Sequence, residues 1–193
     1  MAENKVNFGI ENVYYAVLTE GSTNSWSTPV HVAGAVSITL DSNTTSTPFY
    51  ADNITYYSSF ANNGYTGTLE LARIPETMYS DIWGMSEHST DKVIYEKAGI
   101  QPKPFALLFE KDGDQQDDLY CLYRVIPTSK PTEGTSTIED SATPVTQSFD
   151  FNALPLVTGT TNQLNLISAR SAADTTTTTR NAWYSSVKVP SSD

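Results

Sequence analysis

Strict alternation of apolar and polar residues is the feature that most limits how this chain can fold. Between residues 145 and 153, Phe149 and Phe151 flank Asp150, and the period of two includes Val145 and Ala153, with Gln147 as the polar residue on the apolar side. Residues 36–41 and 68–71 show the same period of two. Because successive side chains of a β-strand point to opposite faces, this pattern predicts strands with one buried and one polar face.

Composition supports a β protein with polar surfaces. The 193 residues include 26 Thr, 21 Ser, 11 Tyr and 7 Phe, and β-branched and aromatic side chains suit a pleated, half-buried surface. The formal net charge is −11, which disfavours tight binding to nucleic acid because such binding needs Lys and Arg to replace counterions. No stretch approaches 18 apolar residues, so no membrane contact is expected, and no signal peptide is visible at the start of the sequence.

One amphipathic helix is predicted at residues 75–84, where a proline precedes an apolar stripe and a glycine follows it. Turns are predicted at residues 41–47, 52–53 and 62–64. The strands at 119–126 and 145–153 are expected to form a long hairpin whose tip, residues 127–143, extends beyond a compact body.

Residues 1–156 are expected to form one β domain, and residues 157–193 a C-terminal arm. The domain carries 8 Lys/Arg and 20 Asp/Glu, a net charge of −12, whereas the arm carries 3 and 2, a net charge of +1. Within the arm, residues 163–173 are expected to form a short helix and residues 183–189 a strand. Trp183 and Tyr184 need a surface that buries them, either on another copy or on the chain's own domain.

No group of residues has the pattern of an active site, so we expect a protein that is not an enzyme and needs no cofactor or metal. His31 and His88 are the only histidines, and Cys121, the one cysteine, lies within a predicted strand. A Cys121–His dyad is conceivable, but a small buried thiol is the usual explanation. The acidic residues from Asp112 to Asp118 do not have the spacing of an EF-hand calcium site, because position twelve is Tyr123.

An ordered series of segments resembles the major tail (tail tube) proteins of long-tailed, siphovirus-type bacteriophages of Gram-positive hosts. The series covers roughly residues 5–156. It consists of residues 34–42 (GAVSITLDS), 47–53 (TPFYADN), 64–75 (GYTGTLELARIP) and 82–84 (IWG), followed by residues 105–109, 111–113 and the Thr-rich strand that ends at 153–155.

This resemblance implies an all-β protomer, sandwich- or barrel-like, with one short flanking helix and a long hairpin. Protomers of that family form sixfold rings that stack into the tail tube, through which DNA leaves the capsid without being specifically bound. It also implies localisation in the virion after synthesis in the host cytoplasm. Implied partners are further copies of the chain and the tape-measure, tail-terminator and distal tail proteins.

On this hypothesis the polar strand faces line the channel and the loops and arm mediate assembly. The expected channel-facing residues are Ser37, Thr39, Asp41, Thr68, Glu70, Ser148 and Asp150. The expected assembly residues are Pro131, Glu133, Glu139, Asp140, Arg170, Trp183 and Tyr184.

Two other classes stay open. A carbohydrate-binding or adhesin-like β-sandwich would be a monomer with an exposed aromatic platform, at Tyr56 and Tyr57 or at Trp183 and Tyr184. Another phage structural protein, such as a tail terminator or a head decoration protein, would share the composition.

Overall fold

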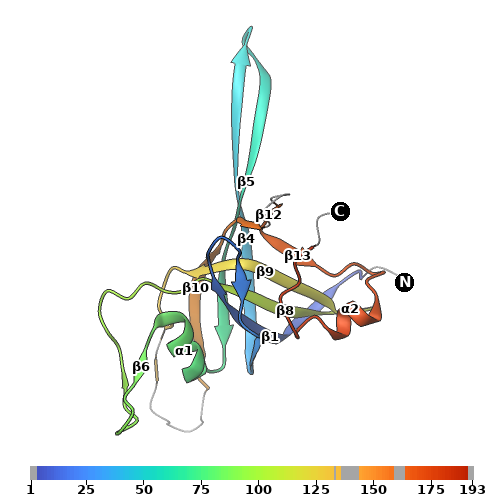
Figure 1. Ribbon diagram of the computed structural model, residues 1–193. Coiled ribbons are helices and arrows are strands. Elements are labelled where there is room, and N and C mark those ends of the chain that lie inside the picture. The colour runs from blue at the N-terminus through green and yellow to red at the C-terminus, as the bar shows by residue number, and fades with distance from the viewer. Residues whose placement is uncertain (1–3, 133, 136–143, 159–163, 191–193) are drawn as a thin grey trace.

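The computed structural model describes residues 4–132, 134–135, 144–158 and 164–190, and it is almost entirely antiparallel β-structure (Figure 1). The main sheet has the order β2-β1-β8-β9-β10-β5-β4, with β3 paired to β1 and β13 paired to β9. This confirms the all-β prediction. The strands are β1 (Asn7–Thr19), β2 (Ser25–Trp26), β3 (Val30–Val32), β4 (Ala35–Ala51), β5 (Ile54–Leu71), β6 (Ser86–Glu87), β7 (Ile94–Tyr95), β8 (Phe105–Gly113), β9 (Asp118–Pro127), β10 (Gln147–Ala153), β11 (Leu156–Thr158), β12 (Leu164–Leu166) and β13 (Ser168–Arg170), and the helices are α1 (Glu76–Trp83) and α2 (Thr177–Asn181).

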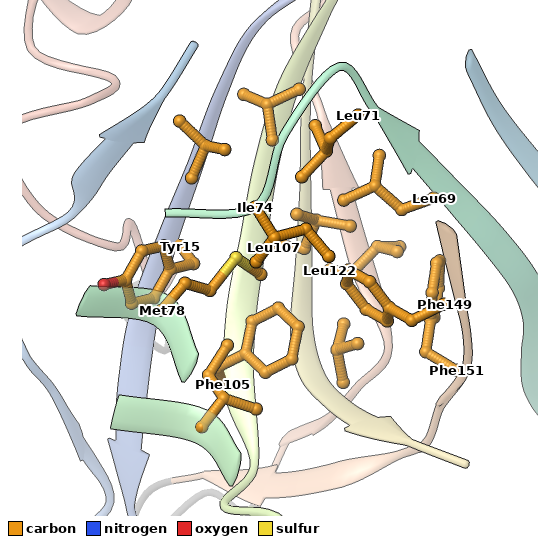
Figure 2. Packing of buried hydrophobic residues seen from close by; sticks show 14 of the residues in the cluster. Tyr15, Leu69, Leu71, Ile74, Met78, Phe105, Leu107, Leu122, Phe149 and Phe151 are labelled. Atoms are coloured by element: carbon orange, nitrogen blue, oxygen red, sulfur yellow. The ribbon is translucent and has the colours of Figure 1, made fainter. Parts of the chain in front are cut away.

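Strand β8 is buried on both faces, which explains its uninterrupted apolar run. Phe105, Leu107 and Phe109 point into a core that also contains α1 and strands β5 and β10 (Figure 2). Ala106 and Leu108, on the other face, join a second core. The body is therefore built around β8, with one apolar layer on each side of the sheet.

Helix α1 confirms the predicted helix and closes the first core. Pro75 precedes it, and Gly84 ends it with φ of 69° while its N–H donates to the Tyr79 carbonyl. Only a residue without a Cβ adopts this left-handed conformation at low cost. Trp83 packs edge-on against Phe149, with the ring centroids 5.1 Å apart, so the helix covers the apolar face of β10.

The C-terminal residues do not form an arm that leaves the body. The helix predicted at residues 163–173 is wrong: β12 and β13 lie there, and β13 pairs with β9 at Cys121. The strand predicted at residues 183–189 is also wrong, because turns and irregular structure follow α2 there. Trp183 is 5% exposed and lies in the second core. The segment adopts these shapes because it completes the open edge and the second face of the main sheet.

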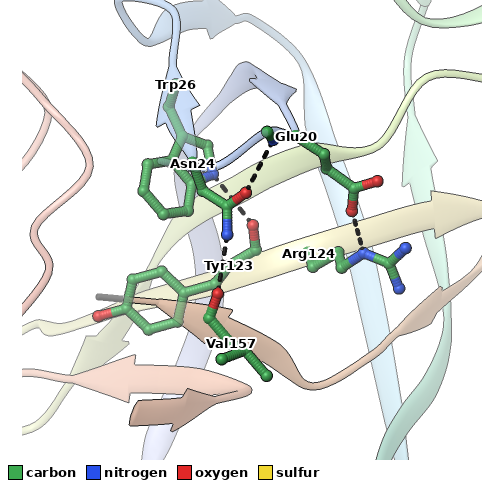
Figure 3. A network of polar contacts seen from close by, with 7 residues as sticks. Glu20, Asn24, Trp26, Tyr123, Arg124 and Val157 are labelled. Atoms are coloured by element: carbon green, nitrogen blue, oxygen red, sulfur yellow. Dashed lines mark hydrogen bonds and ion pairs between the residues drawn. The ribbon is translucent and has the colours of Figure 1, made fainter. Parts of the chain in front are cut away.

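The loop that precedes β2 is held against the body by polar contacts (Figure 3). Arg124 Nε donates to Glu20 Oε1 at 2.5 Å, and Asn24 Nδ2 donates to the Val157 carbonyl at 2.8 Å. Trp26 Nε1 donates to the Tyr123 carbonyl at 3.1 Å. These bonds join the loop and β2 to strands β9 and β11.

The longest hairpin is β4–β5, not the predicted pair at residues 119–126 and 145–153. Strands β9 and β10 pair over only three positions, whereas β10 pairs with β5 along its whole length. The turns predicted at residues 41–47 and 62–64 are wrong, since both segments lie inside strands. The turn at Asp52 and Asn53 is confirmed, and their φ values of 51° and 61° are those of a type I′ hairpin turn.

Gly64 marks the place where this hairpin leaves the body. Its φ is 106°, and a Cβ built on it would lie 2.0 Å from the Ala153 carbonyl oxygen. The strand therefore bends here, close against β10, and no other residue fits. Asn, Asn and Gly at positions 62–64 suggested a turn, but they form a bend and a β-bulge within a continuous ladder.

Candidate functional site: a polar sheet face and an exposed hairpin

All seven residues that the sequence placed at a channel lie on one face of three adjacent strands. The register sets Ser37 and Ser148 on either side of Glu70, and Thr39 and Asp150 on either side of Thr68. A third row contains Asp41, Thr66 and Asn152. The alternate residues of these strands face the first core: Ile38, Leu40, Leu69, Phe149 and Phe151. The predicted alternation of polar and apolar faces is thus confirmed, although no channel is part of a single chain.

Hydroxyl groups on this face donate to its carboxylates. Thr68 Oγ1 donates to Asp150 Oδ1 at 2.6 Å. Glu70 accepts from Thr146 Oγ1 at 2.5 Å and from Ser37 Oγ at 2.9 Å, and these two bonds, the Thr146 one foremost, hold the pKa of Glu70 below its ordinary value.

The three rows contain three carboxylates and no Lys or Arg. We call this surface the acidic face. The Ser37 and Thr68 hydroxyls on it donate to carboxylates, so the surface is polar and acidic.

Those of the predicted assembly residues that the structure describes are scattered rather than grouped. Pro131 is half-buried beside Thr132, whose N–H and Oγ1 donate to the Ser148 carbonyl. Arg170 is exposed at the end of β13. Glu133, Glu139 and Asp140 lie outside the described residues.

Trp183 and Tyr184 are held by the chain's own body. Trp183 Nε1 donates to the Tyr120 carbonyl at 3.4 Å. Tyr184 stacks on Tyr14 with centroids 4.4 Å apart and donates to Glu110 Oε2 at 3.2 Å. Burial, followed by the nearby Glu110 carboxylate, raises the pKa of the Tyr184 hydroxyl. These two aromatic side chains pack against the protomer, so of the two covers expected for them the structure shows the chain's own body.

The sequence analysis missed the largest exposed apolar surface, residues 42–63 of β4 and β5, which we call the outer hairpin. Figure 1 shows it projecting from the body as a two-stranded ribbon. Every residue in it except the half-buried Ala51 is exposed. Its large apolar side chains are between 60% and 72% exposed: Phe49, Tyr50, Ile54, Tyr56, Tyr57 and Phe60.

Both faces of the outer hairpin carry aromatic side chains. Phe49 lies opposite Tyr57 on one face, and Phe60 lies opposite Ser46 on the other. Asp52 is the only charged residue from 42 to 63. A signal for this element was present in the sequence: residues 42–63 are rich in Thr and in aromatic residues, which favour β-strands.

Possible metal ligands, the Cys121 thiol and His88 are the groups considered for chemistry in the described part of the chain. No three His, Cys, Asp or Glu side chains come together there as metal ligands would. Burial raises the pKa of the Cys121 thiol to about 12, so the reactive thiolate is scarce at neutral pH. His88 Nδ1 lies 2.8 Å from Asp91 Oδ1 at an exposed turn. The two helices described are both too short to cross a membrane.

Comparison with known proteins gives no assignment by similarity. Neither a scan against protein-family models nor a search of the curated proteins found a match to this chain.

Proposed function

We propose that this chain is a non-enzymatic virion protein that assembles with copies of itself into stacked rings, forming the tube through which phage DNA passes. The observation that carries this proposal is the outer hairpin. An isolated two-stranded hairpin is marginally stable in water. Keeping five aromatic side chains hydrated is also unfavourable compared with burying them. A partner surface that covers it removes both costs.

Self-association explains the outer hairpin better than a ligand does. A carbohydrate platform needs aromatic rings on one face, whereas Phe60 points away from Phe49 and Tyr57. A ribbon with one charged residue, on a chain of net charge −11, is also where identical copies approach with least repulsion. The aromatic residues therefore support contact with other copies.

The acidic face supports a channel rather than a solvent-facing surface. Strand β4 ends the main sheet, so its outer edge is open to pairing with a neighbouring copy. A ring of copies joined along such edges would set the acidic face along a continuous inner wall. DNA carries about one negative charge per 1.7 Å of duplex axis, so a wall with carboxylates and no cations repels it weakly and leaves nothing to bind it.

The same proposal sets the partners. Further copies of the chain form the tube, and the tape-measure, tail-terminator and distal tail proteins contact its interior and ends. DNA is a transient occupant that makes no specific contact.

Negative-stain electron microscopy of the purified chain tests the proposal. The expected images are rings, sixfold in projection, and hollow tubes at higher concentration. A monomer that persists at every protein and salt concentration contradicts the proposal.

A further inference from the structure

A groove of about 210 Å³ lies beside α1, at the far end of the molecule from the outer hairpin. Its apolar lining comes from Ile74, Tyr79, Met85 and Ile94. A cavity of about 150 Å³ is enough to hold a benzene ring, so this groove accommodates one aromatic or branched side chain. We call it the α1 groove, and its remaining lining residues are Arg73, Glu76 and Gln147.

The α1 groove and the hairpin turn are at opposite ends of one strand. Strand β5 begins directly after the turn and ends at Leu71, two residues before Arg73. A strand of 18 residues is roughly 60 Å long. The turn of a chain therefore cannot reach that chain's own α1 groove, so any docking of the one in the other joins two copies.

The turn carries exposed apolar side chains and a carboxylate, which complement the apolar lining of the groove and its arginine. Tyr50 and Ile54, on either side of the turn, are 64% and 62% exposed. Asp52 gives the tip a single negative charge. The Arg73 side chain, 81% exposed at the edge of the groove, makes only a 3.8 Å ion pair with Glu76. An apolar side chain for the groove and a carboxylate for the arginine are thus presented together.

We infer that the tip of the outer hairpin, residues 50–54, docks in the α1 groove of a second copy, with Asp52 beside Arg73. This inference rests on the proposed function and identifies its axial contact. Because the two surfaces differ and lie at opposite ends, the contact is heterologous and repeats along the β5 direction. A stack of rings needs such a contact.

The area exposed on the whole outer hairpin fits a second copy as the occupant, with Tyr50 as its aromatic contribution at the tip. Phe and Tyr side chains bury roughly 150–250 Å² each, so the five of the hairpin, about two thirds exposed, offer on the order of 600 Å². A partner in a standard interface contributes about 800 Å². A lipid surface is a poorer fit, because residues 42–63 contain no Lys or Arg to hold anionic head groups.

Disulfide trapping in the assembled protein tests the docking. The double variant Asp52→Cys/Arg73→Cys is assembled, oxidised and run on a non-reducing gel. Head-to-tail docking gives a ladder of covalent multimers. The matched control, Asp52→Cys/Thr178→Cys, pairs the tip with an exposed position on α2 and gives no ladder. Cys121 is buried, so the native thiol does not contribute.

The outcomes separate this inference from the proposed function. Tubes without a ladder overturn the docking and leave the tube proposal standing. Absence of rings and tubes from the unaltered chain overturns both.

A charge swap gives a second measurement that does not depend on disulfide formation. Arg73→Asp alone and Asp52→Lys alone each raise the protein concentration needed for tube growth by about 2- to 5-fold, the range for an exposed ion pair. The double variant Asp52→Lys/Arg73→Asp returns it to the unaltered value. Additive losses in the double variant overturn the docking.

Discussion

Strands β4 and β5 each contain two different regions. In the part of β4 that ends at Asp41 and the part of β5 that begins at Gly64, one face of the pair packs on the core and the other is the acidic face. Beyond these residues, the same two strands continue with neither face covered. The backbone pairing is the same in both regions, so the difference lies in what the side chains contact. The body end contributes to the core of the protomer, whereas the outer hairpin exposes its apolar side chains to solvent.

The sharpest test of this comparison replaces one phenylalanine in each region. Phe149→Ala is expected to destabilise the protein by about 3–5 kcal/mol, because Phe149 is 1% exposed and its loss leaves a cavity against α1. Phe60→Ala, at a side chain 70% exposed, is expected to change the free energy of unfolding by less than about 0.5 kcal/mol. Urea unfolding of both variants measures this, and equal losses would remove the distinction between the two regions.

The C-terminal segment is expected to behave like the body. Trp183→Ala should cost about 3 kcal/mol of stability, since the ring fills the second core beside β9. Val189→Ala, at a residue 39% exposed, serves as the control and should cost less than about 0.5 kcal/mol. Thermal unfolding of the two variants compares them. A stable Trp183 variant that no longer assembles would return this segment to the role of an assembly arm.

Substitutions in the outer hairpin are expected to impair assembly and to leave the stability of the monomer unchanged. Phe49→Ser/Phe60→Ser removes one aromatic side chain from each face and is expected to leave monomer stability within about 0.5 kcal/mol of the unaltered chain. Tube growth should be lost, because the covered area on both faces falls. Circular dichroism follows folding, and light scattering follows assembly. The control is Thr45→Ser/Thr47→Ser, in β4, the strand that contains Phe49. Unimpaired tube growth would show that the exposed aromatic residues have another purpose.

The smallest effect is expected on the acidic face. The pKa of Glu70 is lowered in the folded protein by bonds from Thr146 and Ser37, so ionised Glu70 favours the folded state. This contribution is present above the unfolded pKa, near 4.5, and is lost as the pH falls through the lower folded pKa. Stability measured from about pH 6 to pH 3 should fall less steeply for Glu70→Gln than for the unaltered chain. Parallel curves would mean that these bonds do not persist in solution.

The sequence by itself determined the local structure wherever one face of an element is buried. Alternation placed Ile38 and Leu40 toward the core and Thr39 and Asp41 away from it. The stripe before Gly84 predicted α1, and Asp52 and Asn53 predicted the hairpin turn. In each case the period of the apolar residues or the backbone preference of the turn residue decides the structure, and both can be read from neighbouring residues.

Only the tertiary structure decided which strands pair and what covers the ends of the chain. Residues 41–47 and 62–64 have the composition of turns, yet both lie in one ladder, because residues 41–47 pair with residues 59–66 across it. Residues 168–170 became a strand because β9 has an open edge beside Cys121, and Trp183 is buried because the second face of β8 needs a cover. Such pairings depend on residues far apart in the sequence, so no local pattern predicts them.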